Sequence, residues 1–462
     1  MRKLTAVGLM VLLVTTVLGA RQAPYRTLDD KFAPPAFTDV AQWNTRAAYL
    51  REHILASAGL LPMPARAPLA AQIFGEVKRN DYTVSKVYFQ SLPGFLVTGN
   101  LYRPAGEGPF PAVLAPHGHW AYGRLENTTL NSVPGRAINL ARQGFVVFTY
   151  DMVGYDDSRQ LTHTFGGKRE TLWGLSLGGL QLWNSIRSLD FLQSLPYVQR
   201  DALAVTGESG GGTQTFLLAA VDDRVKVAVP VNMISLHMQG GCLCENPPSL
   251  RLDTTNVEIA ATIAPRPMLM ISATGDWTAN TLEAEYPAVR RIYSLLDAPD
   301  HVQAVRMQAD HNYNKESREA MYAWLARWMK GAAPDIQVRE RSFTADSPAD
   351  LLVFHQRPLP PEALTAEQLT ENWIAEARRQ LPATDLQVRG RALRHALGFG
   401  EVRPAAPRAG KSSVVLLAGD DAELERELRS ARFSIKKVAF TAFDAGAAAK
   451  VRHFETYNRT QA

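Results

Sequence analysis

The sequence contains two G-x-S-x-G stretches, and each could hold a nucleophilic serine. The stretch centred on Ser209 directly follows the apolar run 202–206 and leads into a helical pattern. A serine on a tight strand-to-helix turn needs small neighbours, because the strained backbone packs closely against the strand and the helix. The other stretch, centred on Ser176, follows a polar segment, so we interpret Ser176 as a helix-start residue. The sequence therefore predicts a nucleophile elbow at Ser209, with acyl transfer as its chemistry.

A base and an acid are needed as well, because a serine hydroxyl is a poor nucleophile until its proton is removed. On a strand–turn–helix scaffold of this kind, the chain order should be serine, then acid, then histidine. Asp276 follows a predicted strand, and His311 follows the next one. We expect Asp276 to be the acid and His311 the base. The alternatives are that Asp276 is a turn or helix-capping residue, and that Asp310 is the acid. Three other histidines fit the chain order less well: His163, His237 and His301.

Two backbone N–H groups are needed to stabilise the oxyanion of the tetrahedral intermediate. The first is expected to be the amide of Gly210, directly after the nucleophile. The second is expected in the segment PHGHW (116–120), where a glycine lets the backbone turn an amide inward, and we assign it to His119. The alternative is that His117 and His119 pack or bind a metal, although H-x-H spacing without a third ligand is weak evidence for zinc.

Four further residues are candidates for substrate binding. Tyr155 and Asp156 belong to a segment after a predicted strand, which either lies at the pocket rim or forms an ordinary polar turn. Trp120 ends the histidine-containing segment. Glu208 occupies the variable position of the elbow, where its charge acts on the pocket or faces a neighbouring loop.

Cys242 and Cys244 are the two cysteines of the chain. They are separated by one residue, so a disulfide between them would be strained. Two thiols without further cysteines or a convincing histidine set also make a poor zinc site. We therefore expect free or packed cysteines in a loop, and neither a metal nor an organic cofactor.

The composition is that of a globular protein. Of the 462 residues, 46% are hydrophobic and 21% are charged, and the formal net charge is +5. No block of five like charges occurs, which argues against nucleic-acid binding. A basic start, an apolar run at 4–18 and small residues at 19 and 20 are typical of a signal peptide. Because the run is shorter than the ~20 apolar residues of a membrane span, we expect a secreted or periplasmic protein without stable membrane insertion.

Apolar runs and helical periodicity alternate along the middle of the chain. The predicted strands are 82–91, 95–102, 110–116, 145–150, 202–206, 225–231, 267–273 and 302–308. The predicted helices are 136–142, 175–195, 213–221, 283–296 and 317–330. The first two strands form a hairpin, and the later alternation implies crossovers. The pattern predicts the α/β class, with a mostly parallel eight-stranded sheet and helices on both faces.

We divide the chain into a signal peptide (1–20), a main domain with an N-terminal extension (21–335) and a smaller C-terminal α/β region (336–462). In the last region, prolines at 358–361 mark a linker, a helix is predicted at 364–380, and a β-α-β unit is predicted at 414–418, 422–430 and 435–440. One hypothesis is that this region is an incomplete or degenerate second domain.

The motifs together resemble the bacterial acetyl xylan esterase/dienelactone hydrolase-like branch of the α/β-hydrolase superfamily. The resemblance covers roughly 82–330. It is carried by PHGHW (116–120), YDMVGYDDS (150–158), GESGGGTQT (207–215), GGCLCENPPSLR (240–251), APRPMLMISATGDWT (264–278) and HNYN (311–314). It implies the α/β-hydrolase fold, with Ser209 as nucleophile, Asp276 as acid and His311 as base.

These observations predict an exported serine esterase that cleaves carboxylic esters through an acyl-enzyme. The resemblance implies short acyl groups on carbohydrate, acetyl above all, so the expected partner is a small-molecule or oligosaccharide ester. One alternative is a peptidase of the prolyl-oligopeptidase type, for whose propeller the segment before residue 82 is too short. The other is a non-catalytic binding protein on a hydrolase fold, which would not need a triad.

Overall fold

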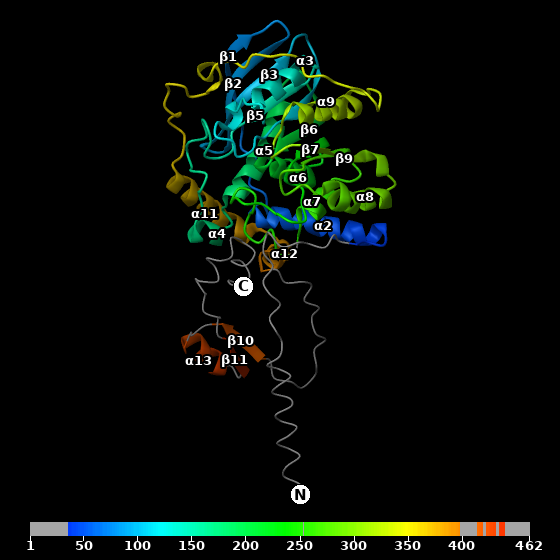
Figure 1. The fold of residues 1–462 in the computed structure, drawn as a ribbon. Coiled ribbons are helices and arrows are strands. Elements are labelled where there is room, and N and C mark those ends of the chain that lie inside the picture. Colours follow the sequence, from blue (N-terminus) through cyan, green and yellow to red (C-terminus); the bar gives the residue numbers. More distant parts are fainter. Residues whose placement is uncertain (1–35, 253, 398–413, 419–421, 431–433, 439–462) are drawn as a thin grey trace.

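The computed structural model describes residues 36–252, 254–397, 414–418, 422–430 and 434–438, and the predicted signal peptide lies outside them. The main body is built around a nine-stranded sheet (Figure 1). Its strands are β1 (Gln72–Lys78), β2 (Tyr82–Leu92), β3 (Phe95–Pro104), β4 (Phe110–Leu114), β5 (Val146–Tyr150), β6 (Val198–Glu208), β7 (Val225–Val231), β8 (Met268–Ala273) and β9 (Val302–Met307). Their spatial order is β1-β2-β3-β5-β4-β6-β7-β8-β9.

The helices of the main body precede, connect and follow these strands. They are α2 (Val40–Ser57), α3 (Val133–Arg142), α4 (Lys168–Leu172), α5 (Leu177–Ser194), α6 (Gly210–Val221), α7 (Asn256–Ala261), α8 (Tyr286–Leu295) and α9 (Lys315–Lys330). Three more follow along the chain: α10 (Pro348–Leu351), α11 (Ala366–Ala383) and α12 (Leu386–Leu397). All five predicted helices of the central region are present, with bounds that differ by a few residues.

The strand pairing changes from antiparallel at one end of the sheet to parallel in the rest of it. β1, β2, β3 and β5 are paired antiparallel, whereas β5, β4, β6, β7, β8 and β9 are paired parallel. The predicted hairpin and the parallel crossovers are confirmed. The predicted count of eight strands is wrong by one, because the sheet also includes the edge strand β1. Along β1 only Phe74 and Val77 are partly buried, and the pairing of β1 with β2 shifts in register between them. The regular alternation of apolar and polar residues that predicts a strand is therefore missing from this segment.

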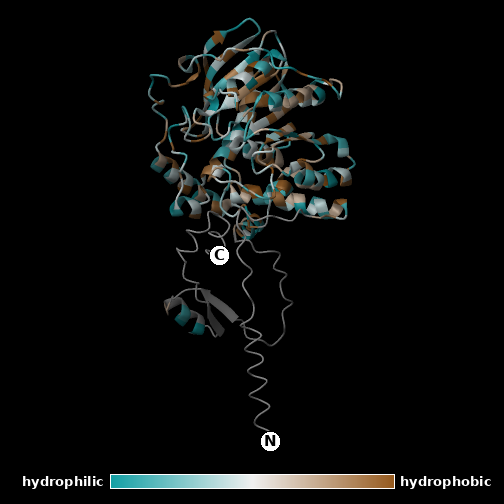
Figure 2. Cartoon of the chain, viewed as in Figure 1, coloured by the Kyte–Doolittle hydropathy of each residue, from teal (hydrophilic) through white to brown (hydrophobic). Residues whose placement is uncertain are grey.

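The central strands are apolar on both faces, as parallel strands between two helical layers must be. Side chains alternate along β4: Ala112 and Leu114 pack into the core with α2, α5, α6 and α8, while Val113 packs into the core with α3 and α9. In Figure 2, hydrophilic and hydrophobic residues alternate along the peripheral helices, as expected for helices with one buried and one exposed face. The two cores hold the sheet rigid, and the carboxyl ends of its parallel strands carry the site.

The segment after α9 lies against the main body as far as the end of α12. The Leu351 carbonyl accepts hydrogen bonds from Asn100 and Arg124, and the Trp373 indole N–H donates to the Trp173 carbonyl. The helix predicted at 364–380 corresponds to α11, which begins with a capping box at Thr365. The division at residue 335 stays a prediction, since these contacts cross it.

The predicted β-α-β unit is present as β10 (Val414–Ala418), α13 (Ala422–Ser430) and β11 (Ser434–Val438). Its two strands pair in parallel, from Val414 with Ser434 to Ala418 with Val438. Its role as a second domain stays a hypothesis. Within the described part of the chain, no helix has the length and apolar character needed to span a bilayer.

Candidate active site

Ser209 stands on a sharp turn between β6 and α6. Its backbone has φ 56° and ψ −122°, a left-handed conformation that costs energy for any residue with a side chain. A Cβ added to Gly207 or to Gly211 would lie 2.4 or 2.5 Å from the Pro116 carbonyl oxygen, so both positions require glycine. The Ser209 amide donates to the Val231 carbonyl at 3.0 Å. This strained, closely packed turn has the geometry of a nucleophile elbow.

Ser176, in the other G-x-S-x-G stretch, has a different local structure. It is the N-cap of α5, with extended backbone, and its hydroxyl accepts the Gly179 amide at 3.1 Å. The interpretation of Ser176 as a helix-start residue is confirmed.

His311 and Asp276 form a hydrogen-bonded pair. The imidazole Nδ1 lies 2.8 Å from Asp276 Oδ2, and the other carboxylate oxygen accepts from the amide (2.7 Å) and the hydroxyl (2.5 Å) of Thr278. The Asp276 side chain is 2% exposed and that of His311 is 26% exposed. A buried carboxylate fixed by three contacts therefore orients a histidine that is partly exposed. Asp310, the alternative acid, is exposed.

The loop that carries His311 is tied to the strands beside the elbow. The Asn232 amide group, just after β7, donates to the Asn312 carbonyl at 2.8 Å. The Thr206 hydroxyl, on β6, lies 2.6 Å from the Tyr313 hydroxyl. Because β6 leads into Ser209 and β7 accepts its amide, these bonds place the histidine loop and the elbow at the same edge of the sheet.

Two indole rings flank His311. Trp120 stacks on the imidazole with ring centroids 6.1 Å apart, and the Trp277 ring is 4.6 Å away. Trp120 also donates its indole N–H to Glu208, the residue before Ser209, at 2.9 Å. Trp120, predicted to contact substrate, therefore connects the base to the elbow.

The three rival histidines are engaged elsewhere. Nδ1 of His301 faces the Pro265 carbonyl at 2.7 Å, and Nε2 of His237 faces the Asn280 amide at 3.1 Å. His163 contacts Cys242 at 3.3 Å.

The two predicted oxyanion residues are neighbours. A Cβ added to Gly210 would lie 2.6 Å from the His119 ring, and one added to Gly118 would lie 3.0 Å from Ser209 Cβ. The Gly118 carbonyl accepts from the Trp120 amide at 2.9 Å and faces His117 Nδ1 at 2.7 Å. In a trans peptide the N–H points opposite to the C=O. Fixing the Gly118 carbonyl therefore fixes the direction of the His119 amide.

Glu208 is completely buried and is bound by several donors. One carboxylate oxygen accepts from the Gly118 amide (3.0 Å), the Trp120 indole (2.9 Å) and the Asn131 side chain (2.9 Å), and the other accepts from Arg136 at 2.7 Å. Burial alone would raise the pKa of Glu208, but the charge of Arg136 and the hydrogen bonds from Arg136 and the Gly118 amide lower it below its usual value. The structure thus places this predicted substrate contact inside the protein, in contact with the segment 116–120, which we call the oxyanion loop.

Tyr155 and Asp156 lie near the same loop. The Tyr155 ring packs edge-on against His117, with centroids 5.3 Å apart, and against His163, at 4.8 Å. Asp156 accepts the Arg124 amide at 2.9 Å. Arg124 itself is fully buried between Asp151 and Asp157, an ion network that fixes the segment carrying Tyr155. Sequence reasoning missed this network, because charged residues give no sign of burial in a single sequence.

The stability of the fold should fall as the pH drops from about 6.5 to about 4. Burial lowers the pKa of His117 from 6.5 to about 4, and Nε2 accepts the Met152 amide at 3.0 Å, which requires the neutral ring. The unfolded chain binds a proton in this pH range that the folded chain does not. The stabilisation is therefore complete above pH 6.5 and is lost as the pH falls, by about 3 kcal/mol.

Urea unfolding at pH 7 and pH 4 tests this expectation, with His117→Gln as the matched variant that cannot titrate. The loss of stability between the two pH values should be smaller in the variant by about 3 kcal/mol. Equal losses in both proteins would contradict the account of His117.

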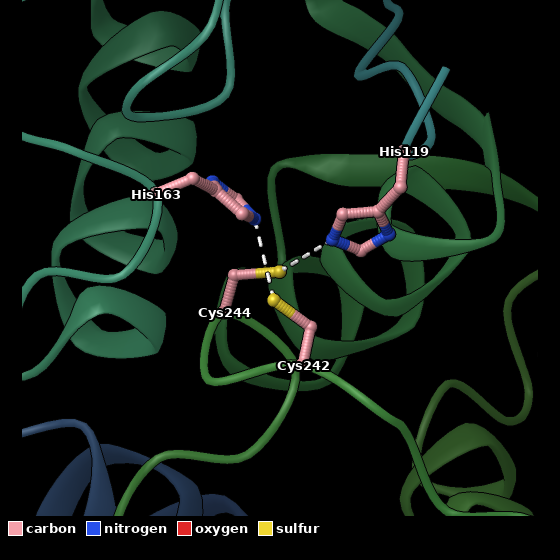
Figure 3. Close-up of side chains that lie close together, drawn as sticks. All are labelled: His119, His163, Cys242 and Cys244. Atoms are coloured by element: carbon pink, nitrogen blue, oxygen red, sulfur yellow. Dashed lines mark hydrogen bonds between the residues drawn. The ribbon is translucent and has the colours of Figure 1, made fainter. Parts of the chain in front are cut away.

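A second group of side chains gathers beside the oxyanion loop. His119 Nε2 lies 3.1 Å from Cys244 Sγ, and Cys242 Sγ lies 3.3 Å from His163 Nε2 (Figure 3). We call these four residues the Cys–His cluster. The prediction that no convincing histidine set accompanies the cysteines is wrong, since two histidines from distant segments contact them. No local spacing could reveal this, because three separate loops supply the residues.

Electrostatics in the cluster favour a thiolate. A hydrogen bond from the Cys244 thiol is the main cause that lowers the pKa of Cys242, to about 2, whereas burial raises the pKa of Cys244. A cavity of 260 Å³ opens beside the loop that carries the two cysteines, and it is lined in part by Phe165, Leu243 and Pro248. Its lining does not include the nucleophile, the acid or the base.

Comparisons with known proteins agree with this architecture. No family model matches the chain. Among solved structures, the methylesterase BT1017 is similar with a TM-score of 0.65 at 29% identity, over 75% of this chain and 78% of that one. The fold is that of the α/β hydrolases. The α/β-hydrolase fold predicted from the sequence is therefore confirmed.

Two other proteins are similar at lower levels. A curated relative, "Putative hydrolase YtaP" of Bacillus subtilis (strain 168), is 27% identical over 292 residues, which are 58% of this chain and 95% of that protein. The acetyl xylan esterase from Paenibacillus sp. R4 is 19% identical with a TM-score of 0.43, over 65% of this chain and 98% of that one. The predicted class, a carboxylic ester hydrolase, is borne out by the similarity to the methylesterase BT1017 and to the curated hydrolase.

Proposed function

We propose that this protein is an exported serine esterase that uses Ser209, Asp276 and His311. The observation that carries the proposal is a strained elbow serine at the same sheet edge as a histidine bound to a buried carboxylate. A protein that only binds carbohydrate has no need of strain at a serine or of a histidine held in one orientation. Export is part of the proposal and rests on the sequence of residues 1–20 alone.

The first half of the reaction forms an acyl-enzyme. Ser209 Oγ attacks the ester carbonyl carbon while His311 takes its proton, and Asp276 stabilises the resulting imidazolium. The negative charge that develops on the carbonyl oxygen is stabilised by the amides of Gly210 and His119. His311 then returns the proton to the departing alcohol. In the second half, His311 activates a water molecule, which releases the acid and restores Ser209.

The favoured substrates are short acyl esters of carbohydrates, acetyl esters above all. This proposal follows from the resemblance of the motifs to acetyl xylan esterases. A second candidate is a methyl ester of a sugar acid, which the similarity to the methylesterase BT1017 favours. The two differ in which side of the ester the sugar occupies: the alcohol side in the first case and the acyl side in the second.

An ester panel tests the function. It contains an acetylated sugar, a methyl ester of a sugar acid, a long-chain acyl ester and an amide of the same short acyl group. We expect the acetylated sugar to give the highest kcat/KM and Ser209→Ala to lower it by at least about 10³-fold. Hydrolysis of none of the esters would contradict the proposed esterase. Cleavage of the amide as fast as the ester would indicate the peptidase alternative.

A further inference from the structure

Two groups of side chains in the described part of the chain could hold a metal ion: His117 with Asp151 and Asp156, and the Cys–His cluster. The first is fully accounted for by protein contacts, because His117 bonds to two backbone groups and Asp151 pairs with Arg124. The Cys–His cluster is different. The proposed reaction uses the amide of His119, but it leaves the imidazole of His119 and the other three side chains without a role.

The geometry of the cluster is that of a small tetrahedral site. All four donor atoms, two Nε2 and two Sγ, lie within 4.8 Å of one another. Zn–S bonds of about 2.3 Å and Zn–N bonds of about 2.0 Å place S and N ligands about 3.5 Å apart in a tetrahedron. The two contacts of 3.1 and 3.3 Å therefore need to open by only a few tenths of an ångström. Figure 3 shows both imidazole rings with Nε2 turned toward the sulfurs.

The surroundings of the cluster already orient its ligands. His163 Nδ1 lies 2.6 Å from the Val153 carbonyl, which fixes the proton on Nδ1 and leaves the Nε2 lone pair free for a metal. Glu245 accepts the amides of Gly241 and Cys242, at 2.8 and 3.0 Å, and so holds the cysteine loop. The His119 ring is confined by its packing over Gly210. Hydrogen bonds to the remote ring nitrogen and to the ligand loop are the usual supports of a protein metal site.

We propose that His119, His163, Cys242 and Cys244 bind one zinc ion. Two thiolates and two imidazoles suit zinc and exclude hard cations such as magnesium and calcium, which prefer oxygen ligands. Four protein ligands complete the tetrahedron, so the ion has a structural role and does not activate water. It joins the oxyanion loop, the loop around His163 and the cysteine loop. Through His119, the ion fixes the backbone that carries a proposed oxyanion donor.

Zinc content and cobalt spectroscopy of the full chain test the proposal. After purification under reducing conditions, we expect one zinc per chain by elemental mass spectrometry. Cobalt substitution should give thiolate charge-transfer absorption and the intense visible bands of a tetrahedral site. Cys242→Ser and His163→Gln should each weaken zinc binding by at least about 100-fold. His237→Ala, a histidine change near the cysteine loop, is the control and should retain the ion.

These measurements do not depend on ester hydrolysis, so the zinc site and the proposed function can fail separately. Circular dichroism establishes that each variant is folded. Reduced wild-type protein that takes up neither zinc nor cobalt would overturn the proposal. Tetrahedral cobalt absorption that persists in a folded Cys242→Ser, Cys244→Ser double variant would overturn it as well, because the thiolates would then not be the ligands.

Discussion

Replacement of Asp276 by asparagine is expected to lower kcat for ester hydrolysis by about 10⁴-fold, with a much smaller effect on KM. The Asp276 carboxylate accepts a hydrogen bond from Nδ1–H of His311 at 2.8 Å, so Nε2 carries the lone pair that acts as the base. An asparagine can present its N–H₂ group to Nδ1, which favours the wrong tautomer, and it cannot stabilise the imidazolium. Steady-state kinetics on an acetyl ester measure the effect.

The matched control is Asp310→Asn, one residue before the histidine. Asp310 is exposed, so its replacement should leave kcat within a few-fold of the wild-type value. If Asp310→Asn were the inactive variant and Asp276→Asn the active one, the acid would have to be reassigned.

Replacement of Glu208 by glutamine is expected to destabilise the fold by about 3–5 kcal/mol, because it leaves the buried Arg136 charge unpaired. The two side chains are fully buried and 2.7 Å apart. Glutamine keeps an oxygen for the Gly118 amide and the Trp120 indole, so the folded variant should keep most of its activity. Urea unfolding measures the stability. The double variant Glu208→Gln, Arg136→Met removes the unpaired charge and should recover much of the loss.

Replacement of Glu208 by alanine adds a second effect. The Gly118 amide and the Trp120 indole lose their acceptor, so the oxyanion loop is no longer held. We expect kcat to fall by about 10²–10³-fold, as when an oxyanion donor is removed, with KM little changed. Under conditions where both variants are folded, equal kcat values for the glutamine and alanine variants would show that Glu208 does not position the loop.

Local sequence patterns were sufficient for the elbow and for the pair that accompanies it. The strand before Ser209 and the glycines around it are adjacent in the chain, and Asp276 and His311 each follow an apolar run that predicts a strand. The distinction between Ser209 and Ser176 was available for the same reason: only one of them follows an apolar run. The central strands were equally accessible, because each contains a run of buried apolar residues.

Features that depend on distant contacts were not accessible in this way. Glu208 was predicted to reach the pocket or a neighbouring loop, because no pattern in the sequence connects it with Arg136. The Cys–His cluster joins residues up to 125 positions apart, and no local spacing connects the histidines with the cysteines. The edge strand β1 was missed because most of its side chains are exposed and its register with β2 shifts, so its sequence lacks the alternation of apolar and polar residues that is typical of a strand.

Covalent labelling of the nucleophile tests the central claim most directly. A fluorophosphonate reacts with an activated serine and leaves a stable adduct that peptide mass spectrometry can locate. We expect one adduct per chain, on the peptide that contains Ser209, and none in Ser209→Ala, whereas Ser176→Ala should label like the wild type. An adduct on Ser176 would contradict the account. So would a protein that, after treatment with the fluorophosphonate, carries no adduct and hydrolyses esters as fast as before.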